Sequence, residues 1–196
     1  MTTFTPAQPT DADLLQRARE GDPDSFGLLF DRHAAAVLRF CFRRTGSAAS
    51  AEDLTSIVFL VAWEQRAKTV FYEGRARPWL LGVALNVLRS QSRAERRYRD
   101  ALARIPAAAS PEPESDAAIE RLDAERQMQE VLRAVSKLGR REREVVELCV
   151  WEGLSTEEAG RVLDISPGAV RSRLSRARRR LPLLEAALTA VKEGAP

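Results

Sequence analysis

The stretch STEEAGRVLDISPGAVRSRLSRARRRL, residues 155–181, predicts two short helices joined by a tight turn. Ser155 and Glu158 have the spacing of a capping box, which marks the start of the first helix. Ser166 followed by Pro167 marks the start of the second helix, because proline fits the first helical position without losing a hydrogen bond. The three residues before Ser166 form a turn of the length that a helix-turn-helix requires.

The second helix of this motif is amphipathic and strongly basic. At about 100° per residue, its apolar seam consists of Val170, Leu174, Ala177 and Leu181. The opposite side carries Gly168, Arg171, Ser172, Ser175, Arg176 and Arg179. No acidic residue accompanies the arginines of this helix, whereas a merely solvated helix normally intersperses glutamate for i,i+4 pairs. The pattern therefore favours nucleic-acid binding over a solvated basic helix.

Charge is distributed unevenly along the chain. The 196 residues are 44% hydrophobic and 30% charged, enough apolar residues for one or two small cores. The net charge is only +3, so the basic character must be local. Arginines concentrate in residues 89–99 and 171–180, and acids in residues 11–31 and 112–125. Two separate basic helices indicate two separate contacts with nucleic acid.

The sequence shows no features of an exported protein, a membrane protein or an enzyme. Cys41 and Cys149 lie in apolar helical runs, where a free cysteine is usually a small core residue, so we expect neither a disulfide nor a metal site. Signal-peptide features and a membrane-length apolar run are both missing. His33 is the only histidine, and no phosphate loop or nucleophile motif occurs. We therefore expect a cytoplasmic protein that is not an enzyme, needs no cofactor and does not insert into a membrane.

Four amphipathic helices are predicted before residue 100, and such helices pack into a compact bundle. The first is capped by Thr10 and the second ends at Gly46. A capping box of Ser50 and Asp53 is predicted to open the third, and Pro78 the fourth, which turns basic in its second half.

The remaining segments divide the chain. Residues 1–10 are predicted to be a disordered tail, and residues 101–118 a flexible linker, because that segment contains three prolines, many acids and nothing to bury. Helices resume over about 119–138 and 140–151 and lead into the helix-turn-helix. The predicted fold is all-α, with two small helical domains, a four-helix bundle and a helix-turn-helix domain, joined by the linker.

Three segments together resemble a known family. SAEDLTSIVFLVAW (50–63), RPWLLGVALNVLRSQSRAERR (77–97) and LGRREREVVELCVWEGLSTEEAGRVLDISPGAVRSRLSRARRRL (138–181) look like a bacterial RNA polymerase sigma factor of the extracytoplasmic-function group, in the sigma-70 family. The last segment by itself also resembles LuxR-type regulators, which would bind DNA as dimers without polymerase. The alternative function is therefore that of a LuxR-like DNA-binding regulator. The segments in the N-terminal half of the chain distinguish a sigma factor from such a regulator.

The resemblance implies a transcription initiation factor that directs core RNA polymerase to promoters. Sigma region 2 would cover residues 11–100 and bind both the polymerase and the −10 element, and sigma region 4 would cover residues 119–191 and bind the −35 element. The polymerase contacts would be Glu52, Asp53 and Leu54. A further partner could be an anti-sigma factor, and the sequence does not say whether one exists or which protein it is.

The same resemblance assigns DNA contacts to both halves. The −10 contacts would be Trp79, Asn86, Arg89, Arg93, Arg96 and Arg97. Asn86 would read a flipped base while the arginines hold phosphates, whereas Trp79 fits a core anchor as well as a stacking platform. The −35 contacts would be Arg171, Ser172, Arg173, Ser175, Arg176, Arg178 and Arg179. Arg171 or Arg176 is the predicted base reader, because arginine to guanine is the commonest specific contact.

Overall fold

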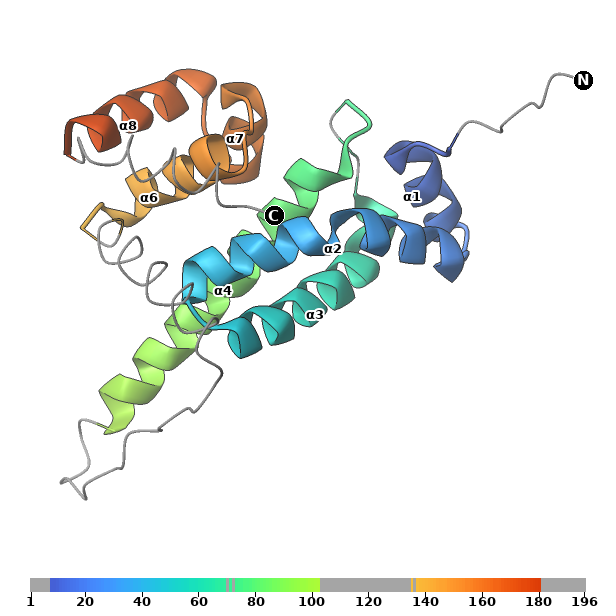
Figure 1. Cartoon of the computed structure of the whole chain (residues 1–196), viewed down its shortest axis with the longest axis horizontal. Helices are drawn as coiled ribbons and strands as arrows, with labels where there is room; N and C mark the ends of the chain where they lie inside the picture. The colour runs from blue at the N-terminus through green and yellow to red at the C-terminus, as the bar shows by residue number, and fades with distance from the viewer. Residues whose placement is uncertain (1–7, 70, 72, 103–134, 136, 181–196) are drawn as a thin grey trace, which may run out of the picture.

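The computed structural model describes residues 8–69, 71, 73–102, 135 and 137–180. All of its regular elements within these residues are helices, as predicted (Figure 1). They are α1 (Asp11–Arg19), α2 (Pro23–Thr45), α3 (Ala48–Gln65), α4 (Ala76–Leu102), α6 (Arg140–Val146), α7 (Thr156–Leu163) and α8 (Pro167–Arg180). A 3-10 turn, Arg66–Lys68, follows α3, and a π-helical turn, Glu147–Trp151, continues α6. We call α1–α4 the N-terminal domain and α6–α8 the C-terminal domain.

Several predicted segments fall mainly outside the described residues. These are residues 1–7 of the tail predicted over 1–10, the part of the predicted linker beyond Leu102 and most of the helix predicted over 119–138. At the start of the predicted linker, residues 101 and 102 still belong to α4.

Helix ends confirm most of the caps expected from the sequence. Thr10 caps α1 through a reciprocal pair of hydrogen bonds with Asp13, and Gly46 ends α2 in the left-handed conformation, with φ of 69°. The predicted capping box of Ser50 and Asp53 is wrong. α3 begins one turn earlier, where the side chain of Ser47 accepts a hydrogen bond from the Ser50 N–H at 3.4 Å.

The start of α4 also differs from the prediction, because it depends on a distant residue. The helix begins at Ala76 rather than at Pro78. Asp11 Oδ2 accepts a hydrogen bond from the Ala76 N–H at 3.0 Å and lies 2.8 Å from His33 Nε2. Arg32 donates to the other oxygen of Asp11 at 3.2 Å. One carboxylate therefore joins α1 and α2 to the start of α4.

Replacing Asp11 by alanine is expected to lower the free energy of unfolding by about 1–3 kcal/mol at pH 7, because a buried N–H and a ring nitrogen lose their partner. Burial opposes ionisation of Asp11, but the Ala76 hydrogen bond and the charge of His33 outweigh it, so its pKa lies below 3.8. The contribution is thus complete above about pH 4 and disappears as the pH falls through the lowered pKa. Urea unfolding across this range checks it, and Asp31→Ala, at an exposed site on α2, is the control.

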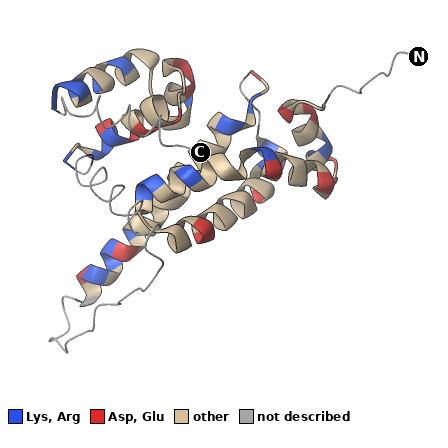
Figure 2. Cartoon of the chain, in the orientation of Figure 1, with Lys and Arg blue, Asp and Glu red and all other residues tan. Residues whose placement is uncertain are grey.

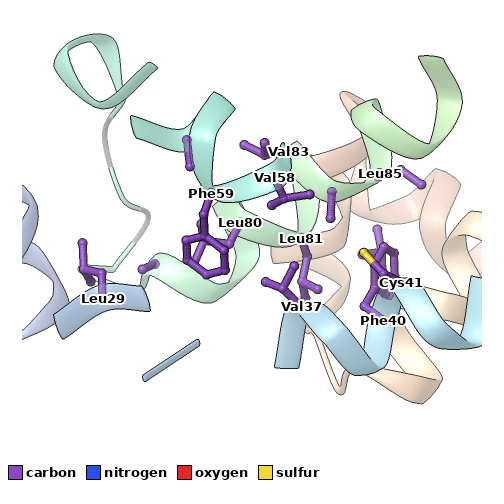
Figure 3. Packing of buried hydrophobic residues seen from close by; sticks show 14 of the residues in the cluster. Leu29, Val37, Phe40, Cys41, Val58, Phe59, Leu80, Leu81, Val83 and Leu85 are labelled. Atoms are coloured by element: carbon purple, nitrogen blue, oxygen red, sulfur yellow. The ribbon is translucent and has the colours of Figure 1, made fainter. Parts of the chain in front are cut away.

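A continuous apolar core runs through both domains. Side chains from α2, α3 and α4 converge, among them Phe40, Val58 and Leu81, each at most 1% exposed (Figure 3). The same cluster includes Leu148 and Val170 of the C-terminal half. Burying one such leucine contributes about 1.5–3 kcal/mol. The two domains therefore pack directly on each other in this structure.

Cysteine reactivity and metal binding have no structural support within the described residues. Cys41 and Cys149 are free thiols in this structure. Burial raises the pKa of both to about 11, so neither is a thiolate at neutral pH. Among these residues no group of acidic, histidine and cysteine side chains is arranged to hold a metal ion. None of the described helices has the length and apolarity needed to cross a membrane.

Candidate nucleic-acid interface

The predicted helix-turn-helix is present in α7 and α8. The side chain of Ser155 accepts from the Glu158 N–H at 3.1 Å, and Glu158 accepts from the Ser155 N–H at 2.9 Å, which completes the expected capping box. The turn is tight, with Asp164 in the left-handed conformation. A Cβ atom on Gly160 would lie 2.7 Å from the carbonyl oxygen of Ile165, so the backbone of the turn passes closely over this glycine.

α8 packs through its seam and leaves its basic side in solvent. Val170 is 0% exposed and Ala177 is 1% exposed, as the periodicity predicted. The predicted −35 residues that are exposed are Arg171, Ser172, Ser175, Arg176, Arg178 and Arg179, whereas Arg173 is half-buried. Arg171 lies 3.9 Å from Glu157, and Arg176 lies 3.8 Å from Glu142. The Arg171–Glu157 pair is exposed on both sides and contributes little, so a phosphate or base can replace it, whereas the side chain of Glu142 is only 12% exposed.

The second half of α4 forms another basic surface (Figure 2). Arg93, Arg96 and Arg97 are exposed there. Asn86 is exposed one turn earlier and accepts a hydrogen bond from Arg89 at 3.2 Å. Trp79 is half-buried against Phe71, with ring centroids 5.3 Å apart, so it has an anchoring contact.

Arg89 is bound by the other domain and its side chain is only 20% exposed. Both oxygens of Glu144 accept from its guanidinium, at 2.8 and 2.7 Å. Glu144 is 3% exposed and lies on α6. A hollow of about 500 Å³ between α4 and α7 is lined by Trp79, Asn86 and, from α7, Val162. Trp79, Asn86 and Arg89 therefore lie at the boundary between the domains, whereas Arg93, Arg96 and Arg97 lie farther along α4.

The predicted polymerase residues divide into two exposed acids and one core residue. Glu52 and Asp53 are exposed on α3, while Leu54 is only 4% exposed and packs inward. Asp53 and Leu54 line a hollow of about 650 Å³ between α3 and α4. Ile57 also lines this hollow and is 45% exposed, and Leu60 on the same helix is 59% exposed.

A set of ion pairs joins the two domains and was not predicted from the sequence; we call it the arginine–glutamate interface. Its members are Arg43, Arg44, Arg75, Arg77 and Arg89 of the N-terminal domain and Glu144, Glu147, Glu152 and Glu158 of the C-terminal half. All four carboxylates are at most 5% exposed. The available signal was the run VVELCV, which places a glutamate in an apolar stretch.

Geometry within the interface is close and charge-matched. Glu152 accepts from Arg43 at 2.6 Å and from Arg77 at 2.7 Å, and Arg75 donates to Glu158 at 2.7 Å. Arg44 donates to Glu147, which is 1% exposed. Burial raises the pKa of Glu147, against the attraction of Arg44. The ionised pair is therefore held at a desolvation cost.

Comparison with known proteins follows the same division of the chain. The family described as "Sigma-70 region 2" matches residues 29–98, and "Sigma-70, region 4" matches residues 128–181. The chain is 37% identical over 169 residues to RNA polymerase sigma factor CarQ of Myxococcus xanthus, covering 83% of this chain and 90% of that protein. It is 33% identical over 159 residues to ECF RNA polymerase sigma factor SigL of Mycobacterium tuberculosis, covering 79% of this chain and 85% of that protein.

Two further matches differ in extent. Identity to ECF RNA polymerase sigma factor BldN of Streptomyces coelicolor is 35%, covering 88% of this chain, which spans 64% of that protein's length. Among solved structures, that of CnrH in complex with the cytosolic domain of CnrY is similar with a TM-score of 0.66 and 26% identity, covering 90% of this chain and 97% of that chain.

Proposed function

This chain belongs to the extracytoplasmic-function group of bacterial RNA polymerase sigma factors, and from that membership we propose that it binds core RNA polymerase and directs it to promoters by reading their −10 and −35 elements. Region 2 would cover residues 11–100 and region 4 residues 119–191. The observation that carries the proposal is the pair of exposed arginine surfaces, one on α4 and one on α8. The factor would work in the cytoplasm by binding, with no catalytic step of its own.

The polymerase contact is proposed on α3. Glu52 and Asp53 supply exposed charge there, and Ile57 and Leu60 supply exposed apolar surface on the same helix. A charged and apolar face of this kind is typical of a protein-docking surface. Leu54 would hold this docking face in place by packing into the core.

An anti-sigma factor is proposed as a second protein partner. The similar structure of CnrH was determined in complex with the cytosolic domain of CnrY. A partner of this kind would hold the chain away from polymerase. Affinity purification of the full chain from its own cells, with and without competing core polymerase, tests for it.

Base reading by Arg176 and phosphate binding by Arg179 are expected to separate by mutation. Arg176→Ala should cost about 1–3 kcal/mol at one −35 position and relax the preference there. Arg179→Ala should weaken all −35 sequences equally and reduce the salt slope by about one. Polymerase holoenzyme binding to a panel of −35 variants measures both. Equal, uniform losses from the two substitutions would show that Arg176 reads no base.

Reconstituted transcription tests the proposed function. Core polymerase, with and without the purified chain, is given fragments of the genome from which the chain comes, and transcript 5′ ends are sequenced. New start sites that share upstream −10 and −35 sequences are the expected result. Transcription that does not change when the chain is added would refute the proposal.

A further inference from the structure

The carboxylate of Glu142 lies between two arginines of α8. Its Oε2 accepts a hydrogen bond from Arg180 Nη1 at 3.1 Å, and its Oε1 lies 3.8 Å from Arg176 Nε. Glu142 belongs to the first turn of α6, and its side chain is only 12% exposed, whereas both arginine side chains are more than half exposed. A shielded acid of one helix therefore pairs with two solvent-facing arginines of the next.

Apolar packing fixes the position of Glu142 relative to α8. Ala177, the residue after Arg176, is 1% exposed and belongs to the same buried cluster as Leu138 and Val146, which lie on either side of Glu142 in the sequence. The small side chain of Ala177 lets α6 and α8 approach closely. Because this contact holds the two helices together, the acid stays beside Arg176 without relying on the ion pair itself.

The spacing of the two arginines makes a shared acid useful. Arg176 and Arg180 are four residues apart, so they are neighbours on one side of α8, and like charges at this spacing repel each other. Glu142 offsets that repulsion by pairing with both. Without the acid, the two side chains would move apart and Arg176 would sample more orientations.

The nitrogen of Arg176 that pairs with Glu142 matters for base reading. The pairing uses Nε and does not use the two terminal nitrogens of the guanidinium. A guanine accepts two N–H groups from one guanidinium, through its O6 and N7 atoms. An arginine whose planar group is oriented before binding loses less conformational entropy when it makes this contact.

Arg171, the other predicted base reader, has no comparable support from its acid partner. It lies 3.9 Å from Glu157 Oε1, and both of these side chains are more than half exposed. A solvated pair of this kind contributes little and does not restrain a long side chain. Arg176 therefore has a shielded acid as its partner, whereas Arg171 has a solvated one.

We propose that Glu142 is a positioning residue for −35 recognition, which orients the guanidinium of Arg176 toward a guanine before DNA is bound. This inference rests on the proposed reading of the −35 element by α8. A negative charge near DNA also repels phosphates. Glu142 thus contributes to discrimination between bases and adds nothing to the affinity for DNA in general.

Glu142→Gln tests this role, because it removes the charge and nearly keeps the shape of the side chain. Binding of polymerase holoenzyme is measured with each of the four bases at every −35 position, and Arg176→Ala identifies the position that Arg176 reads. Preference at that position should fall about two- to tenfold in Glu142→Gln, the range expected when one long side chain must be ordered on binding. Preference at the other positions should not change, and the affinity for non-preferred sequences should not fall.

Two comparisons separate positioning from a general effect of charge or structure. Glu157→Gln, the same change of charge beside Arg171, is the matched control and should leave the preference at the Arg176 position unchanged. Glu142→Gln added to Arg176→Ala should cause no further loss of preference, because residues that act through one contact are not additive.

The outcomes distinguish this inference from the proposed function. Unchanged preference in Glu142→Gln at the position that Arg176 reads, or an equal effect of Glu157→Gln there, would overturn the role of Glu142. Equal loss of preference at every −35 position would show that Glu142 only braces α8, and would overturn it as well. If Arg176→Ala itself changes no base preference, base reading by Arg176 is refuted, and the inference falls with it.

Discussion

Replacement of Arg44 by methionine is expected to lower the free energy of unfolding by about 3–5 kcal/mol at pH 7, because Glu147 then remains buried with its main counter-charge removed. Glu147 is 1% exposed, and burial raises its pKa even with Arg44 present. Without Arg44 that pKa should rise further. Since protonation relieves an unpaired buried carboxylate, the deficit should shrink as the pH falls toward the raised pKa. Urea unfolding of the full chain at several pH values measures both effects.

The double variant Arg44→Met with Glu147→Leu is the matched control. It removes both charges and substitutes apolar groups of similar size, which is often neutral in a buried site. We expect it to regain most of the lost stability. If the single and double variants are equally destabilised, the loss comes from packing and the charge argument is wrong.

Charge reversal at Asp53 is expected to abolish binding of the full chain to core polymerase. Asp53 is exposed on α3 at the edge of the hollow between α3 and α4, so the substitution changes the docking face without entering the core. The circular dichroism spectrum should therefore stay unchanged while the pull-down signal disappears. Glu64→Lys, an equal charge change near the other end of α3, is the control. Retained binding by Asp53→Lys would place the polymerase contact elsewhere.

Short-range features of the fold were predictable because their signals lie within a few residues. The capping box of Ser155 and Glu158 and the left-handed cap at Gly46 each depend on neighbouring backbone groups. The buried seam of α8 was predictable for the same reason, since the helical period alone puts Val170 and Ala177 on one side.

Long-range features were not predictable from one sequence. The start of α4 is set by Asp11, far away in the chain, and this contact gives no local sign. Arg89 was predicted to bind a phosphate, and no signal in the sequence showed that it meets Glu144, because a helical pattern does not reveal which distant charges meet. The exposure of Ile57 was not predictable either, because α3 is apolar on several sides and periodicity does not identify its packed side.

Promoter binding with and without core polymerase tests the central claim most directly. DNase footprinting is carried out on a promoter identified by reconstituted transcription, using the chain alone, core polymerase alone and both together. A sigma factor predicts protection of the −10 and −35 elements only when both proteins are present. Specific, dimeric protection of the −35 sequence by the chain alone, unaffected by polymerase, would contradict the account and favour a regulator of the LuxR type.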